Sequence, residues 1–77
     1  MKENFRESIS ARLRELRASR QYTLKELSIK SNVGVDVISR YENNKVSMQV
    51  DVLNKILEVY GISLSNFFEE IYAKTQK

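Results

Sequence analysis

Residues Leu24–Asn43 decide the fold and read LKELSIKSNVGVDVISRYEN. Helical patterns over about residues 24–31 and 35–43 are separated by only three residues, so the two helices must cross at a steep angle. Ser28 is small enough for a close crossing, and Asn32 tolerates the left-handed backbone conformation that the turn needs. Apolar anchors stand on both sides of the turn, namely Leu27, Val33, Ile38 and Tyr41. This pattern predicts a helix-turn-helix, whose second helix stands far enough out to enter the major groove of DNA.

The ends of these two helices carry capping signals. Thr23 and Glu26 have the spacing of a capping box, in which each side chain bonds the backbone N–H of the other residue. Gly34 is the expected N-cap of the second helix. Asn43 and Asn44, which accept a left-handed conformation, are expected to end it.

Three further helices are predicted, over about residues 5–19, 49–60 and 64–73. Each has an apolar stripe at helical spacing. The stripes are Phe5, Ile9, Leu13 and Leu16; Val50, Leu53, Ile56 and Leu57; and Leu64, Phe67, Phe68, Ile71 and Tyr72. Ser47 or Gln49 caps the second of these helices, Gly61 follows its end, and Ser63 caps the third. We therefore expect an all-α protein, a compact five-helix bundle formed as one domain by residues 1–77.

The composition excludes several function classes. The 77 residues contain no Cys, no His, no Pro and two Gly. The lack of Cys rules out disulfides and thiolate zinc sites, and the lack of His removes the commonest general base and metal ligand. The chain also has no nucleophile–base pair and no Gly-rich phosphate loop. We expect neither an enzyme nor a cofactor, a metal or a small-molecule ligand.

Nothing in the sequence indicates a membrane or an export route. No apolar run approaches the roughly 20 residues needed to span a bilayer. The first ten residues, MKENFRESIS, lack the apolar region of a secretory signal. We expect a cytoplasmic protein without a membrane partner, associated with the nucleoid if it binds DNA.

The distribution of charge favours a polyanionic partner on one side. The net charge is +3, but residues 1–45 carry ten Lys and Arg against six Asp and Glu, whereas residues 46–77 carry three against four. A basic first half beside a slightly acidic second half suggests one surface that faces a polyanion. Solvated helix faces are the alternative explanation of the same charges.

Four segments together resemble a known family. They are ARLRELRASRQYT, LKELSIKSNV, ISRYENNK and GISLSNFF, and the likeness extends over about residues 9–68. In combination they resemble the lambda-repressor-like, or Xre and Cro/CI type, helix-turn-helix proteins of phages and bacteria. Some members are phage repressors and others are controllers of restriction–modification operons. The resemblance implies a sequence-specific, double-stranded DNA-binding transcription regulator, a repressor or autoregulator that binds operator half-sites as a homodimer.

The same resemblance assigns roles to individual residues. The residues that match base-reading positions are Val35, Asp36, Val37, Ser39 and Arg40. Those that match or add to phosphate contacts are Arg12, Thr23, Leu24, Lys25, Asn44 and Lys45. Arg17 and Glu42 match a structural ion pair of the family, which ties the first helix to the third.

Two of these residues depart from the family pattern. Leu24 stands where the family often has Gln, so only its backbone N–H is left for a phosphate. Asp36 puts a negative charge beside the polyanion, where it either accepts from cytosine N4 or caps the helix N-terminus. Arg40 can bond O6 and N7 of guanine together, or can instead pair with Asp36 one turn away.

The apolar last helix suggests an interface. We expect one face, with Leu64, Phe67 and Ile71, to enter the core, and the other, with Phe68 and Tyr72, to remain exposed. An exposed aromatic patch usually marks an interface. The expected homodimer contact therefore comprises Phe68, Tyr72 and the neighbouring Ile71.

One other function stays open at this point. The same fold serves as a protein-interaction module, such as an antitoxin or a binder of a signalling partner, with weak or no specific DNA binding. Leu24, Val35 and Asp36 favour that alternative, because none of them carries a charge that attracts DNA.

Overall fold

The computed structural model describes residues 5–43 and 47–75. Five helices follow one another: α1 (Phe5–Arg20), α2 (Leu24–Ser31), α3 (Val35–Glu42), α4 (Val50–Val59) and α5 (Leu64–Thr75). No strand occurs in this described part of the chain. The prediction of an all-α, five-helix protein is confirmed, and every predicted helix end lies within two residues of the observed one.

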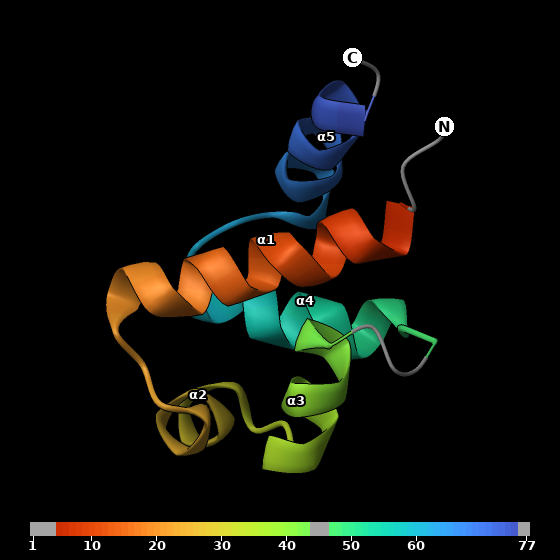
Figure 1. Ribbon diagram of the computed structural model, residues 1–77. Helices are drawn as coiled ribbons and strands as arrows, with labels where there is room; N and C mark the ends of the chain where they lie inside the picture. The colour runs from red at the N-terminus through yellow and green to blue at the C-terminus, as the bar shows by residue number, and fades with distance from the viewer. Residues whose placement is uncertain (1–4, 44–46, 76–77) are drawn as a thin grey trace.

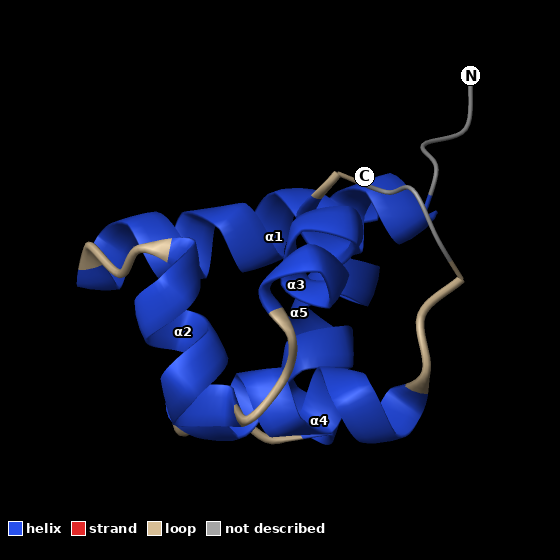
Figure 2. Ribbon diagram, turned by 90° about the horizontal axis from the view of Figure 1, so that it is seen from below, coloured by secondary structure: helices blue, strands red, loops and turns tan. Residues whose placement is uncertain are grey.

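The long helix α1 runs through the middle of the molecule (Figure 1). It packs against α3 on one side and against α5 on another, while α2 packs against both α3 and α4. Figure 2, turned by 90°, shows that α3 crosses in front of the layer formed by α1 and α4, with α2 beside it. The second and third helices therefore form one end of the molecule, and α5 lies at the other.

Apolar side chains from all five helices form the core. The buried residues are Ile9, Leu13, Leu16, Leu27, Val33, Ile38, Tyr41, Leu53, Ile56, Leu57, Tyr60, Phe67 and Ile71. The stripe predicted for α4 is wrong at its first member, because Val50 is 60% exposed. Val50 begins α4 at the rim of the bundle and lines an open groove beside Phe5 of α1, so its position in the periodic pattern does not lead to burial.

The turns of the helix-turn-helix follow the capping signals. Thr23 Oγ1 accepts from the Glu26 backbone N–H at 3.0 Å, and Glu26 Oε1 accepts from the Thr23 N–H at 2.8 Å. Asn32 is left-handed, with φ 62°, and Gly34 is the N-cap of α3 without a side-chain bond. At the end of α3, however, Asn43 has φ −110° and is not left-handed. Asn43 thus ends α3 as predicted, but in another conformation, in which its side chain donates to the Ser39 carbonyl at 2.7 Å; Asn44 lies outside the described residues.

The remaining helix ends are also accounted for. Gly61 follows α4 with φ 71°, a backbone conformation that glycine adopts at little cost. Ser63 Oγ accepts from the Asn66 N–H at 3.1 Å at the start of α5. Gln49, not Ser47, is the N-cap of α4. No helix in residues 5–43 and 47–75 is long and apolar enough to cross a membrane.

Candidate nucleic-acid interface

Helix α3 presents one face to solvent and buries the other. Val35 is 41% exposed, and Asp36 and Arg40 are exposed as well. Ile38 and Tyr41, on the opposite face, are buried in the core. The predicted base-reading residues therefore share the outer side of α3, with Val37 and Ser39 half-buried at its edges.

Arg40 and Asp36 do not pair with each other. Within the residues that the structure describes, neither side chain has an ion-pair partner. The Arg40 guanidinium is therefore available to a ligand outside the chain. Ser39 is less available, because its hydroxyl lies 3.5 Å from Asn43 Nδ2.

The start of α2 offers less to a phosphate than the sequence suggested. The capping box occupies the acceptor side of the Thr23 hydroxyl, and the Glu26 carboxylate lies at the helix N-terminus. Leu24 is half-buried and packs against the core, and its side chain has no group that can bond a phosphate. Lys25 is exposed and supplies the positive charge at this end.

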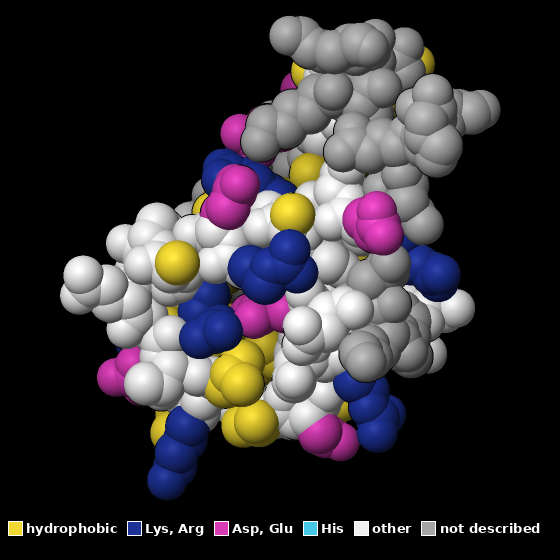
Figure 3. Space-filling view, in the orientation of Figure 1, with side chains coloured by type: hydrophobic (Ala, Val, Ile, Leu, Met, Phe, Trp, Pro, Cys, Tyr) yellow, Lys and Arg dark blue, Asp and Glu magenta, His cyan; other side chains and the backbone are white. Residues whose placement is uncertain are grey.

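Basic side chains spread over the surface built by α1, α2 and α3. Figure 3 shows Lys and Arg across the lower and middle part of this face, with acidic and hydrophobic side chains between them. The face is therefore a mixed surface, and the three helices together carry eight Lys and Arg against five Asp and Glu. Asn44 and Lys45, which were assigned to phosphate contacts, lie outside the described residues.

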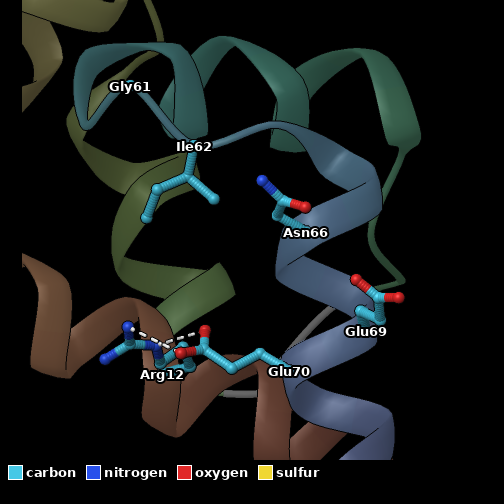
Figure 4. Close-up of a pocket in the computed structure, with 6 residues that line it drawn as sticks. All are labelled: Arg12, Gly61, Ile62, Asn66, Glu69 and Glu70. Carbon is cyan, nitrogen blue, oxygen red and sulfur yellow. Dashed lines mark hydrogen bonds and ion pairs between the residues drawn. The ribbon is translucent and has the colours of Figure 1, made fainter.

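The structure separates Arg12 from this surface. On α1, residues two apart point about 200° from each other, so Arg12 points away from Ser10 and Arg14, which face α3. Arg12 pairs with Glu70 of α5 at 3.2 Å and with Glu15 at 3.2 Å. It lines a hollow of about 450 Å³ together with α5 and the segment before it (Figure 4). Arg12 therefore lies on the α5 side of α1, away from α3, and its phosphate contact stays a prediction.

An ion pair ties α3 to α1. Arg17 Nε and Nη2 donate to the two Glu42 carboxylate oxygens at 2.8 and 3.0 Å, and Arg17 Nη1 donates to the Tyr22 carbonyl at 3.0 Å. The Glu42 side chain is 5% exposed and that of Arg17 27%. The hydrogen bond to Glu42 raises the pKa of Arg17 above its ordinary value. The pair joins the last residue of α3 to α1, and because its Glu42 end is buried it serves the fold.

A buried hydroxyl lies near this pair. Burial, reinforced by the charge of Glu42, raises the pKa of Tyr60 to about 12. The Tyr60 hydroxyl has no hydrogen-bond partner among the described residues. The Arg20 guanidinium lies over the Tyr60 ring, 5.5 Å from its centre. Tyr60 thus lies near the Arg17–Glu42 ion pair without forming a hydrogen bond to it.

The connection from α3 to α4 contains polar contacts that sequence reasoning missed. The Tyr41 hydroxyl accepts from the Gln49 N–H at 2.9 Å, which fixes the start of α4 against α3. A hollow of about 220 Å³ beside Arg40 is lined partly by Ser47 and Gln49. A tyrosine on an apolar stripe signals only burial, so nothing in the local pattern indicated this bond.

The predicted dimer residues on α5 differ in exposure. Ile71 is 1% exposed and belongs to the core, so its place in an interface is wrong: α1 packs over that side of α5. Phe68 is half-buried, because Phe5 stacks on it at 6.3 Å and Phe67 meets it edge-on at 5.6 Å. Tyr72 is 59% exposed.

The arrangement of these helices defines a class of protein. A short helix that is anchored on one face, crosses its predecessor after a three-residue turn and presents polar side chains outward is the DNA-reading unit of lambda-repressor-like regulators. A family model described as "Helix-turn-helix" matches residues 13–67, and the chain belongs to this family. In the described residues, no group of three or more acidic, His or Cys side chains lies close enough to hold a metal ion.

Individual relatives agree with this assignment. The HTH-type transcriptional regulator PuuR of Escherichia coli (strain K12) is 39% identical over 59 residues, which are 77% of this chain and 32% of that protein. The protein of the same name from Shigella flexneri matches equally well. The chain thus spans about a third of the length of these curated relatives.

Solved structures resemble the whole chain. The clp gene regulator ClgR from Corynebacterium glutamicum matches with a TM-score of 0.80 and 25% identity, covering 97% of this chain and 96% of that one. A variant of the restriction–modification controller protein C.Esp1396I matches with a TM-score of 0.82 and 25% identity, covering 100% and 98%.

Proposed function

We propose that this chain is a sequence-specific transcription regulator that represses by occupying operator DNA as a homodimer. The observation that carries the proposal is the outer face of α3, where Val35, Asp36 and Arg40 are exposed while Ile38 and Tyr41 anchor the opposite face. An anchored helix of this kind fits the major groove, which is about 12 Å wide. Its action on an operator would take place in the cytoplasm, at the nucleoid.

The exposed side chains supply distinct chemistry for base reading. Arg40 can donate to O6 and N7 of one guanine. Val35 and Val37 offer methyl groups that suit contact with the thymine methyl, and Asp36 can accept from cytosine N4. Lys25 and the Thr23 hydroxyl are the described groups that best suit the DNA backbone, with Asn44 and Lys45 as further candidates.

The proposed homodimer rests on an apolar surface between the start of α1, the start of α4 and α5. Phe5 and Val50 are 43% and 60% exposed, and they line a groove of about 590 Å³ together with the half-buried Phe68 and Met48. Tyr72 on α5 is also exposed. A two-fold pairing through such a surface would present two α3 helices to half-sites about 34 Å apart.

The first experiment is selection of binding sites from random duplex DNA, followed by affinity measurements with Arg40→Ala. Lys55→Ala is the matched control, because Lys55 is an exposed cation on α4, outside the α2–α3 surface. Arg40→Ala should weaken the selected site by about 1–3 kcal/mol and relax the preference at one position, whereas Lys55→Ala should not. Equal affinities for the two variants would remove Arg40 from the reading surface.

The interaction-module alternative predicts a different result. Glu26 and Asp36 place negative charges at the starts of α2 and α3, which is the observation that favours it. Binding to random duplex at low salt, lost steeply as salt is added, supports DNA as the partner. No binding at low salt supports the module.

The dimer is tested separately by sedimentation equilibrium. Val50→Glu should shift the chain towards monomer, and the new carboxylate in the first turn of α4 is favourable for the helix itself. Ile29→Glu is the control, since Ile29 is 72% exposed on α2, away from the groove. A dimer that survives Val50→Glu would place the interface elsewhere.

A further inference from the structure

The C-terminal end of α3 is held by hydrogen bonds from α1. The last carbonyls of any helix have no partner within the helix and need one from outside. Ser10 Oγ donates to the Tyr41 carbonyl at 2.6 Å, and the bond is buried. Arg14 Nη1 donates to the Glu42 carbonyl. These are the final two residues of α3, so α1 supplies the acceptors with donors that α3 itself lacks.

The donors form one stripe along α1. Ser10, Arg14 and Arg17 follow one another at four- and three-residue steps, which places them on one face of the helix. This polar stripe runs beside the apolar stripe that packs into the core. Two of its members carry positive charge, which is favourable at the negative end of the α3 dipole. Helix α1 therefore holds the end of α3 at three groups: the Tyr41 carbonyl, the Glu42 carbonyl and the Glu42 carboxylate.

The other end of α3 is held by apolar packing of Val33 and Ile38 and has no hydrogen bond of this kind among the described residues. Gly34 provides no side-chain cap, and Val35 and Asp36 are exposed. Seven residues of helix rise about 10 Å, so a tilt of about 5° at the held end displaces Val35 by about 1 Å. Hydrogen bonds to base edges lose strength over such a distance. The hydrogen bonds at the C-terminal end therefore help to set the direction in which α3 points.

We infer that Ser10 and Arg14 are positioning residues for DNA reading, an inference that rests on the proposed function. Arg14 is exposed and basic, and lies beside α3, which are the features of a phosphate contact. Its guanidinium instead donates to the α3 backbone. Arg14 acts on base recognition through the orientation of α3, and Ser10 does the same without any charge.

The test compares Arg14→Gln with Arg20→Gln. Arg20 is on the same helix, is exposed, and donates to the Tyr60 carbonyl at the end of α4 at 3.3 Å. The two variants therefore lose the same charge and the same kind of bond, but only Arg14→Gln releases α3. Affinities for the selected site and for random duplex are measured across a salt series, with the folded fraction checked by circular dichroism.

Arg14→Gln should lower the ratio of specific to non-specific affinity about tenfold, the size of a single faulty base contact. The salt dependence should match that of Arg20→Gln. Ser10→Ala, which changes no charge, should lower the ratio as well. A loss in Arg14→Gln that is equal for both DNAs, with a salt slope smaller by about one than in Arg20→Gln, would make Arg14 a phosphate contact and overturn the inference. An unchanged ratio in Arg14→Gln would also overturn it.

The failure of the proposed function is distinguishable from the failure of this inference. If the unsubstituted protein shows no preference between selected and random DNA, the proposed function falls and the inference falls with it. If it shows the preference and Arg14→Gln keeps it, only the positioning role is lost.

Discussion

Removing Arg17 should destabilise the protein more than any change on the surface of α3. The Glu42 carboxylate is 5% exposed and receives two hydrogen bonds from Arg17, at 2.8 and 3.0 Å. Arg17→Met keeps most of the aliphatic stem but leaves that carboxylate buried without its partner. Breaking a buried ion pair from one side typically costs about 3–5 kcal/mol. A 77-residue domain has a total stability of about 4–12 kcal/mol, so this variant should lose a large share of it.

The companion variant Glu42→Gln should behave differently in two backgrounds. In the unsubstituted protein it should cost about 1–2 kcal/mol, because the guanidinium it leaves behind is 27% exposed and can reach water. In the Arg17→Met background the same change should restore stability, since a neutral amide is cheaper to bury than a carboxylate.

Urea denaturation of the four proteins at pH 7, followed by circular dichroism, measures these differences. The decisive quantity is the sign of the change in unfolding free energy that Glu42→Gln causes in the Arg17→Met background. If Glu42→Gln destabilises both backgrounds to the same extent, or if Arg17→Met costs less than about 1 kcal/mol, the pair is effectively solvated and the reasoning from its burial is refuted.

Four further predictions concern three residues outside this pair. Tyr60→Phe removes a buried hydroxyl without a partner in the described structure and should raise the free energy of unfolding by about 1 kcal/mol in urea titrations. A fall of the unfolding free energy by the same amount would mean that the hydroxyl is hydrogen-bonded. The pKa of Tyr60 is raised from its ordinary value of 10.0 to about 12 in the folded protein. The protein should therefore keep its full stability below pH 10 and lose part of it as the pH rises to about 12, whereas the Tyr60→Phe variant should not show this loss. Gln21→Gly should raise the melting temperature, by a stabilisation of about 0.5–1 kcal/mol, because Gln21 has φ 59°, and an unchanged or lower value would contradict that. Asn32→Ala should cost about 1 kcal/mol, because Asn32 is left-handed at the turn, and a neutral result would show that the turn rearranges.

Local signals in the sequence predicted the elements well. The capping box of Thr23 and Glu26, the left-handed Asn32 and the Gly61 that follows α4 each depend on residues within one turn of one another. Such interactions form wherever the segment is helical, so they can be identified from the sequence without knowing which other elements pack against that segment. The outer face of α3 follows in the same way, because the buried positions Ile38 and Tyr41 leave the other side to solvent.

Errors arose where a residue's neighbour comes from a distant part of the chain. Periodicity placed Val50 on the apolar face of α4 but did not reveal that this turn lies at the rim. It identified Arg12 as a cation on α1 but did not show that α5 brings Glu70 against it. Periodicity placed Ile71 correctly in the core, but its inclusion in the dimer contact was wrong, because at 1% exposure it cannot reach a partner.

The five helices, most of their caps and the steep turn between α2 and α3 could be predicted from the chain alone, because they depend on backbone sterics and on contacts between residues a few positions apart. Which face of α1 holds α3 became clear only from the three-dimensional packing. The hydrogen bonds from Ser10 and Arg14 join residues 31 and 28 positions apart. Their acceptors are backbone carbonyls, which every residue has, so no residue type in the sequence indicates where such a bond forms.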